Sequence, residues 1–532
     1  MLRVEILDTT LRDGAQGEGV ELSLDDKRRV ALALERLGVP LIEGGSPHAN
    51  PKDEKLFDEA RRAPFLTTSF LVPFGSTCHQ SVAPCDDAGL RALVATEQPV
   101  VSVFGKADLL HVTDVLRVSP EENLRMIERS VAYLRENGRR VLFDAEHFFD
   151  GCRTDRAYAF LALQAALRGG ADTVVLCDTN GGTLPDDLRA RACEAMATMP
   201  QARFGIHCHD DMGLAVAGTL ACVQAGARHA QGTVSGVGER CGNANLWTLI
   251  PTLQLKLGYD VLPPENLPLL TETARAVVDT LNLTPNRRAP YVGYSAFTHK
   301  GGMHIDGVSK NSATFELIRP GDVGNRRRFL VSDQAGRSGV YVRLRRILPE
   351  LARDDPRVKL VTDRLKRREL RGYAYEGAEG SFDLMALETL HLRRRFFEVT
   401  DFHVLCGLTG GENARVYIKI TVDGREEINA AEGDGPVNAL DNALRKALSV
   451  FYPSLRRMRL RDFKVRVLDS HGTASGVRVL IESTDGKSVW TTVGVSANII
   501  QACFKALSDS FAYFLTFLDS PDAEGERPEA GR

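Results

Sequence analysis

The sequence lacks the features of a membrane, secreted or nucleic-acid-binding protein. No apolar run approaches the roughly 20 residues that a membrane-spanning helix needs, and Met1–Asp8 reads as a strand without the flanks of a signal peptide. The ten cysteines form no C-x-x-C pair, which argues against a zinc ribbon or a disulfide framework. Lysine and arginine total 67 against 70 acidic residues, so there is no basic excess to attract a nucleic acid. We therefore expect a cytoplasmic protein with neither membrane nor nucleic-acid partners.

The 532 residues suffice for about three domains, and 43% of them are hydrophobic. Over the first half of the chain, short β-rich runs alternate with amphipathic helical segments, of which Ser23–Leu37 is the clearest. This alternation predicts a (β/α)8 barrel. A doubly wound sheet is the alternative, but no G-x-G-x-x-G motif follows a strand. The predicted strands are Val4–Leu7, Pro40–Glu43, Phe65–Leu71, Val100–Phe104, Val141–Asp144, Thr173–Cys177, Arg203–His207 and His229–Thr233.

The second half of the chain changes character twice. After Pro263 the pattern is mainly helical and irregular, and near Leu390 it returns to strands. Ala414–Val422 and Val477–Glu482 alternate apolar and polar residues, and each is followed by another strand and a helix, which suggests a ββα duplication. We therefore divide the chain into a barrel at 1–262, a linker subdomain at 263–390, an α+β domain at 391–518 and a disordered tail at 519–532.

A pair of histidines is the first feature that can carry chemistry. His207 and His209 flank Cys208 at the C-terminal end of a predicted strand, so both side chains lie on one face. Two imidazoles in that position can bind a divalent metal, although a pair of hydrogen-bonded histidines is the simpler alternative. Active sites of (β/α)8 barrels gather at this end of the strands, which favours the metal.

Two further loops carry candidate ligands. Asp13 and Arg12 follow the first strand, where the carboxylate can supply a hard oxygen to a metal and the guanidinium can bind a carboxylate or enolate oxygen. A surface ion pair is the alternative. Asn243 follows the eighth strand in the glycine-rich segment 236–245 and is either a neutral oxygen ligand or a helix cap.

Polar residues at three more strand ends fall on the same predicted rim, at Glu43, at Glu146 and at Asp178–Asn180. One aspartate, two histidines and one asparagine suit a divalent ion that keeps open positions for substrate. Such an ion polarises a carbonyl group as a Lewis acid.

The combination of three motifs resembles a known superfamily. D-T-T-L-R-D-G at 8–14, H-C-H at 207–209 and G-E-R-C-G-N at 238–243 are similar to the metallolyases that include isopropylmalate, homocitrate and citramalate synthases and hydroxymethylglutaryl-CoA lyase. Further segments resemble the citramalate synthase branch, which uses pyruvate. These segments are Glu43–Gly45 with Asn50–Asp53, Phe148–Gly151, Cys177–Pro185, Ser295–Asn311 and Asp322–Asn325. The C-terminal domain is similar to the regulatory, dimerising domain of isopropylmalate synthases, which the lyases lack.

The resemblance implies a role for each candidate residue. Asp13, His207, His209 and Asn243 are the implied ligands of a divalent metal such as Mg, Mn or Zn. Arg12 would stabilise the keto-acid oxygen, Glu43 and Thr179 would lie beside the substrate carboxylate or a bound water, and Gln16 would hydrogen-bond at the same rim. Glu146 and His304, the latter from the linker, are the implied acid/base candidates, and the sequence does not choose between them. Phe315 stands where relatives commonly carry tyrosine.

The implied reaction condenses acetyl-CoA with pyruvate and water to give (R)-citramalate and CoA, on a route to isoleucine through 2-oxobutanoate. The implied assembly is a homodimer with isoleucine as feedback inhibitor, although the C-terminal module can instead serve dimerisation alone. Alternatives are the same chemistry on 2-ketoisovalerate, as in the 2-isopropylmalate synthases of leucine biosynthesis, or on 2-ketoglutarate. A lyase that runs the reverse cleavage and a non-catalytic amino-acid sensor remain further alternatives.

Overall fold

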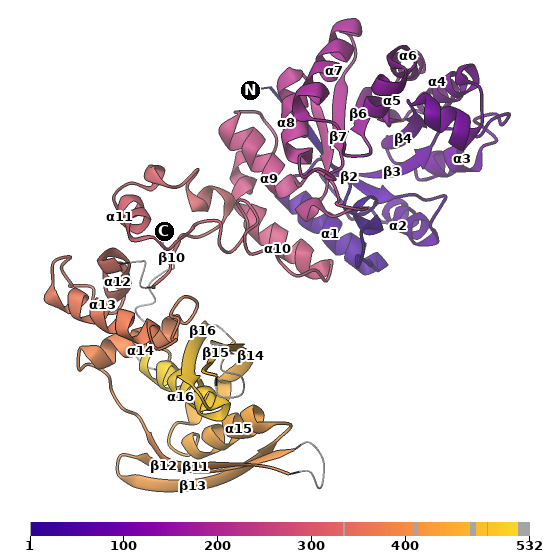
Figure 1. The fold of residues 1–532 in the computed structure, drawn as a ribbon. Helices are drawn as coiled ribbons and strands as arrows, with labels where there is room; N and C mark the ends of the chain where they lie inside the picture. Colours follow the sequence, from indigo (N-terminus) through magenta and orange to yellow (C-terminus); the bar gives the residue numbers. More distant parts are fainter. Residues whose placement is uncertain (1, 333–335, 408–412, 469–474, 487, 520–532) are drawn as a thin grey trace. The chain divides into compact units, whose positions relative to one another are not determined.

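The computed structural model describes residues 2–332, 336–407, 413–468, 475–486 and 488–519 (Figure 1). The chain forms two compact units, one of residues 1–297 with 318–326 and one of residues 298–317 with 327–532. Each unit builds its own hydrophobic core. Beyond Asp519, the tail predicted at 519–532 lies outside the described residues.

Parallel strands β1 to β8 of the first unit close into a barrel in sequence order. Because β1 pairs with both β2 and β8, the (β/α)8 prediction is confirmed and the doubly wound sheet is excluded. The strands are β1 (Glu5–Asp8), β2 (Leu41–Gly45), β3 (Phe70–Ser76), β4 (Val100–Lys106), β5 (Arg140–Glu146), β6 (Thr173–Asp178), β7 (Phe204–Cys208) and β8 (His229–Gly232). Helices surround them (Figure 1): α1 (Leu24–Leu37), α2 (Pro51–Arg62), α3 (Ala88–Ala95), α4 (Pro120–Glu136), α5 (Phe148–Thr154), α6 (Arg156–Arg168), α7 (Pro185–Thr198), α8 (Ala215–Ala225), α9 (Leu246–Pro251) and α10 (Leu270–Thr280).

Helix α1 illustrates how local sequence sets the limits of these elements. The Ser23 side chain accepts a hydrogen bond from the backbone N–H of Asp26, and the Asp26 carboxylate accepts one from the backbone N–H of Ser23. This capping box satisfies donors that the first helical turn leaves free. Gly38 ends the helix in the left-handed conformation, which glycine adopts without a Cβ clash. Leu34 and Leu37 are buried, so this face packs into the core.

Strand β3 begins later than the sequence suggests. The apolar start of the segment predicts a strand over Phe65–Leu71, but the observed strand spans Phe70–Ser76. Three backbone N–H groups of residues 67–69 instead donate to the Glu35 carboxylate. This anchor fixes a bend before the strand. The strand then runs through Pro73, a residue that usually argues against a strand interior.

The interior of the barrel is layered, because residues two apart on a strand share one face. A small apolar layer fills its lower part: Leu7, Leu41, Val72, Val100 and Leu142. Two residues further along β2, β4 and β5 the same face carries Glu43, Ser102 and Asp144, all buried. The barrel is therefore closed by hydrocarbon below and lined by polar groups toward the C-terminal ends of its strands.

The first part of the second unit is mainly helical and contains α11 (Gly302–Lys310), α12 (Gly336–Leu344), α13 (Pro356–Glu369) and α14 (Glu379–Thr389). Two short strands, β9 (Thr298–His299) and β10 (Arg328–Phe329), pair in parallel. Val340, Leu365 and Phe382 pack together in the core of the helical part. On α12, Arg343 is buried and donates to the carboxylates of Asp383 and Glu379 on α14, which ties the two helices together.

The rest of the second unit is a duplication, as predicted, with one strand more in each repeat than the sequence suggests. The first repeat is β11 (Glu398–Cys406), β12 (Ala414–Val422), β13 (Arg425–Gly433) and α15 (Pro436–Leu448). The second is β14 (Arg459–Val467), β15 (Val477–Thr484), β16 (Val489–Ser496) and α16 (Ile499–Phe517). Strands β11 and β14 are edge strands with mostly exposed side chains, so they lack the buried alternation that makes β12 and β15 recognisable.

Within the described residues, none of the helices combines the length and the apolar character that crossing a bilayer requires.

Candidate active site

Three side chains from distant parts of the sequence meet at the C-terminal end of the barrel. Asp13 lies in the turn after β1, His207 on β7, and His209 just after that strand. The Asp13 Oδ2 atom is 3.5 Å from His207 Nε2 and 3.9 Å from His209 Nε2. One ligand atom from each residue lies within 4.8 Å of the other two, and all three residues are buried. This spacing is suited to a single metal ion.

The protonation states of these three side chains also favour the binding of a cation. Burial, with the neighbouring His209, lowers the pKa of His207 to about 3. Burial also lowers the pKa of His209. For Asp13 burial acts to raise the pKa, but Arg12 and the two histidines outweigh it and hold the pKa below its usual value. At neutral pH the cluster therefore offers two neutral imidazoles and one carboxylate, the forms in which these side chains bind metals.

Asn243 lies beside His209 of this cluster. It pairs with His209 in a short backbone bridge and is 1% exposed. Its Nδ2 donates to the carbonyl of Val237 at 3.3 Å, while its Oδ1 is buried without a hydrogen-bond partner among the described residues. A buried acceptor without a partner is costly, and a cation beside it would remove that cost. The loop depends on Gly242, which has a positive φ and where a Cβ would collide with the Gly236 carbonyl oxygen.

Arg12 lies between this cluster and the interior of the barrel. Its Nε donates to Glu43 Oε2 at 2.7 Å, and its Nη1 is 3.4 Å from Asp13 Oδ2. The guanidinium lies over the ring of Phe74, 3.9 Å from the centroid. Burial raises the pKa of Glu43 although Arg12 opposes this shift. The two acids and the ring fix the planar group in one orientation, as bidentate recognition of an oxygen ligand requires.

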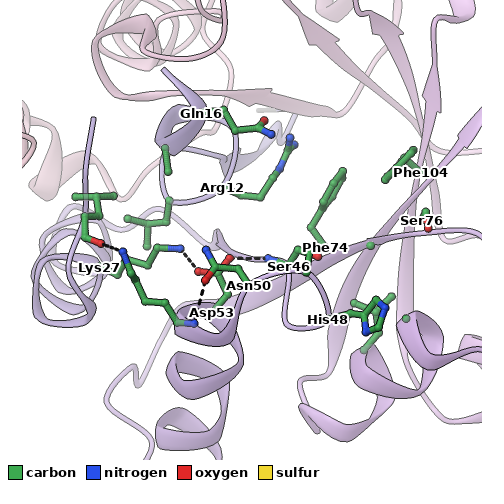
Figure 2. A pocket seen from close by; sticks show the side chains of 18 of the residues that line it. Arg12, Gln16, Lys27, Ser46, His48, Asn50, Asp53, Phe74, Ser76 and Phe104 are labelled. Carbon is green, nitrogen blue, oxygen red and sulfur yellow. Dashed lines mark hydrogen bonds and ion pairs between the residues drawn. The ribbon is translucent and has the colours of Figure 1, made fainter. Parts of the chain in front are cut away.

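A cavity of about 660 Å³ opens beside Arg12 (Figure 2). Arg12, Gln16 and Phe74 line it, and so does the buried ion pair of Lys27 with Asp53. The Asp53 carboxylate also accepts the backbone N–H of Ser46 and so fixes the loop after β2. The volume is in the range of ligand-binding clefts.

Glu146 and Thr179 lie on the same rim, at the end of β5 and just after β6. The Glu146 carboxylate pairs with Lys106 at the end of β4. The Thr179 hydroxyl oxygen accepts the backbone N–H of His147 at 2.8 Å. The sequence analysis missed Lys106, which lies two residues after the predicted strand Val100–Phe104.

Two further histidines were not predicted from the sequence. The rings of His111 and His147 stack with centroids 3.8 Å apart. Their Nδ1 atoms hydrogen-bond to Asp108 and Asp150, respectively. The H-x-x-D spacing of His147 and Asp150 is visible in the sequence, but the partner pair of Asp108 and His111 lies on a different loop, so only the fold brings the two rings together.

The barrel thus brings together nine of the ten residues that the sequence singles out: Arg12, Asp13, Gln16, Glu43, Glu146, Thr179, His207, His209 and Asn243. His304 belongs to α11 of the second unit, so the barrel itself does not supply it. Its ring stacks on Phe315, with centroids 4.1 Å apart.

Family models match most of the chain. Residues 3–277 match the HMGL-like family, residues 291–371 match the homocitrate synthase post-HMGL domain-like family, and residues 376–515 match the LeuA allosteric (dimerisation) domain.

Curated relatives cover almost the full length. The (R)-citramalate synthase of Aquifex aeolicus is 47% identical over 517 residues, which are 96% of this chain and 98% of that protein. The (R)-citramalate synthase of a Synechocystis species is 46% identical over 527 residues, 96% of each chain. A 2-isopropylmalate synthase of Rhodopseudomonas palustris is 31% identical over 456 residues, 83% of each chain.

Proposed function

Because the chain belongs to the citramalate synthase family within the HMGL-like enzymes, we propose that it condenses acetyl-CoA with pyruvate and water to give (R)-citramalate and CoA. The observation that carries this proposal is the cluster of Asp13, His207 and His209 next to the fixed guanidinium of Arg12. A cation site beside an arginine suits a reaction in which negative charge develops on a keto oxygen.

Asp13, His207, His209 and Asn243 would hold the metal, with Mg, Mn and Zn as the candidates. When bound there, a divalent cation supplies Lewis-acid polarisation of the keto group. Arg12 donates hydrogen bonds to the same oxygen as its negative charge grows. Glu43 keeps the guanidinium in place, and the Thr179 hydroxyl and the Gln16 amide at the rim bind the keto-acid carboxylate.

The acetyl-CoA co-substrate must lose a proton from its methyl group. Glu146 and His304 are the candidates for this base, and Glu146 is the one that the barrel itself provides. The resulting carbanion attacks the keto carbon, so a carbon–carbon bond forms and the oxygen takes up a proton. Water then cleaves the thioester, which releases CoA as a free thiol and leaves citramalate.

The preferred keto acid distinguishes a citramalate synthase from enzymes that carry out the same condensation on other keto acids. With acetyl-CoA, we expect pyruvate to give a kcat/KM at least about tenfold above those of 2-ketoisovalerate and 2-ketoglutarate. The first competitor carries two more carbon atoms and the second a further charged carboxylate, and even one extra methylene changes discrimination by about this order. The assay follows release of the CoA thiol. A preference for 2-ketoisovalerate would make the protein a 2-isopropylmalate synthase. Release of thiol with none of these acids, together with absence of bound metal, would favour the amino-acid sensor.

We also propose that the chain acts as a homodimer in isoleucine biosynthesis through the 2-oxobutanoate route, within the cytoplasm. The match to the LeuA allosteric (dimerisation) domain supports the assembly. All ten cysteines are free, which suits a reducing compartment. The division at residues 262, 390 and 518 into catalytic, linker and regulatory parts belongs to the same proposal.

Isoleucine is the expected feedback inhibitor. The segments Gly433–Asn438 and Gly494–Asn498 each lead into a helix, α15 or α16, whose first turn can bind a carboxylate. We expect isoleucine to lower the rate of thiol release at subsaturating acetyl-CoA, and leucine to have little effect at the same concentration. Activity that is indifferent to both amino acids would leave dimerisation as the role of this domain.

A further inference from the structure

A chain of hydrogen bonds runs from His207 into the polar layer of the barrel. His207 Nδ1 is 3.0 Å from Gln231 Oε1. Gln231 Nε2 donates to Asp144 Oδ1 at 2.9 Å. The Ser102 hydroxyl donates to the other oxygen of the same carboxylate at 3.3 Å. Gln231 and Ser102 are 0% exposed and Asp144 is 5% exposed, so solvent does not compete for these bonds.

The direction of these bonds determines the state of the imidazole. In the structure the Gln231 amide turns its N–H₂ toward Asp144 and its oxygen toward His207. The oxygen can only accept, so His207 carries its proton on Nδ1. The lone pair is then on Nε2, the atom that lies 3.5 Å from Asp13 Oδ2.

His209 offers the internal contrast. Its Nδ1 is buried without a hydrogen-bond partner among the described residues. Within the described part of the chain, His207 is therefore the one imidazole of the two whose Nδ1 has a side-chain partner. That partner selects the tautomer and holds the ring.

We propose that Gln231, oriented by Asp144, is a positioning residue that keeps His207 in the tautomer needed to bind the cation through Nε2. This inference rests on the metal site of the proposed function. Partners that hydrogen-bond to the second nitrogen of a ligating histidine raise its basicity and fix its ring, and their loss typically weakens metal binding about 10- to 100-fold.

Metal affinity of the full-length chain, measured without turnover, tests the proposal. Co²⁺ alone is titrated against a chromophoric chelator. Gln231→Leu keeps the approximate size of the side chain but cannot accept the Nδ1–H bond, so we expect its Kd for Co²⁺ to rise about 10- to 100-fold. The double variant Gln231→Glu with Asp144→Asn keeps an acceptor oxygen for the Nδ1–H and supplies an amide donor in place of the Asp144 carboxylate, so we expect it to bind Co²⁺ within about threefold of the wild type.

Gln254→Leu is the matched control. Gln254 hydrogen-bonds to the backbone of Leu262 through both ends of its amide, away from the cluster. Its loss should lower stability without changing the Kd for Co²⁺. If Gln231→Leu does not fold, the tautomer of His207 can still be measured in the wild type. In the metal-free chain with ¹⁵N-labelled histidine, the His207 signal, assigned by its loss in His207→Gln, should show a proton on Nδ1.

The outcomes separate this inference from the function on which it rests. A wild type that binds no Co²⁺ would overturn the metal site itself. A wild type that binds Co²⁺ while Gln231→Leu binds it equally well would overturn only the role of Gln231. A proton on Nε2 of His207 would do the same.

Discussion

Replacement of Asp13 by alanine is expected to lower kcat by on the order of 10³-fold or more, because Lewis-acid activation contributes several kcal/mol to such a reaction. Asp13 is the one anionic group in the cluster, and both histidine Nε2 atoms face its Oδ2. Without it, the two imidazoles and Asn243 offer neutral ligands only, beside the positive charge of Arg12. The variant should therefore also lose its bound cation, which metal analysis of the purified protein measures alongside thiol release.

Two comparisons make this result interpretable. Asp13→Asn keeps the size of the side chain and removes its charge, so it should resemble Asp13→Ala if charge is what holds the cation. Asp186→Asn removes an aspartate that is 95% exposed on α7, and it should leave both kcat and metal content unchanged. Wild-type kcat in Asp13→Ala would remove the residue from the site.

Arg12→Lys is expected to lower kcat/KM by about 10²- to 10³-fold while the metal content stays at the wild-type level. Lysine keeps the positive charge but cannot contact Glu43 and Asp13 from one planar group that also stacks on Phe74. The loss should fall on catalysis, because the donor to the developing oxyanion is no longer held in place.

We choose lysine because Arg12→Ala would combine a loss of catalysis with a loss of folding stability. Glu43 is fully buried, and leaving a buried carboxylate without its partner costs about 3–5 kcal/mol of folding stability. Arg140→Lys is the matched control, since Arg140 forms a bidentate pair with Glu5 at the opposite end of the barrel. It should shift thermal unfolding without lowering kcat/KM. An Arg12→Lys enzyme with wild-type kcat/KM would contradict the assigned role.

The barrel is predictable from the sequence because the fold repeats one simple pattern. Each strand leads into a loop at the C-terminal end of the barrel, where the candidate site lies. Motifs such as H-C-H and G-E-R-C-G-N can therefore be assigned to that end from their positions along the chain. The departures have local causes. Strand β3 contains Pro73, and the edge strands β11 and β14 are mostly exposed, so the usual signals of a strand are weak there.

Residues inside the barrel are harder to find than residues in its loops. Gln231 and Asp144 lie within strands that read as ordinary β sequence, and their importance comes from contacts across the barrel. Those contacts join residues separated by 87 positions. Lys106 was missed for a similar reason, since its partner Glu146 lies on the next strand. Pairings of this kind depend on strand register, which one sequence does not reveal.

The apolar layer of the barrel separates two populations of charge. Below it, Glu5 pairs with Arg140 and His229, and above it lie Glu43, Asp144 and the cluster of Asp13, His207 and His209. The hydrocarbon between the two has a low dielectric constant, so charges on its two sides are screened from one another less than they would be in water. A substitution that changes the net charge at the base can therefore shift the electrostatic potential at the other end of the barrel. Variants made at the base to raise thermal tolerance should conserve charge, as Arg140→Lys does.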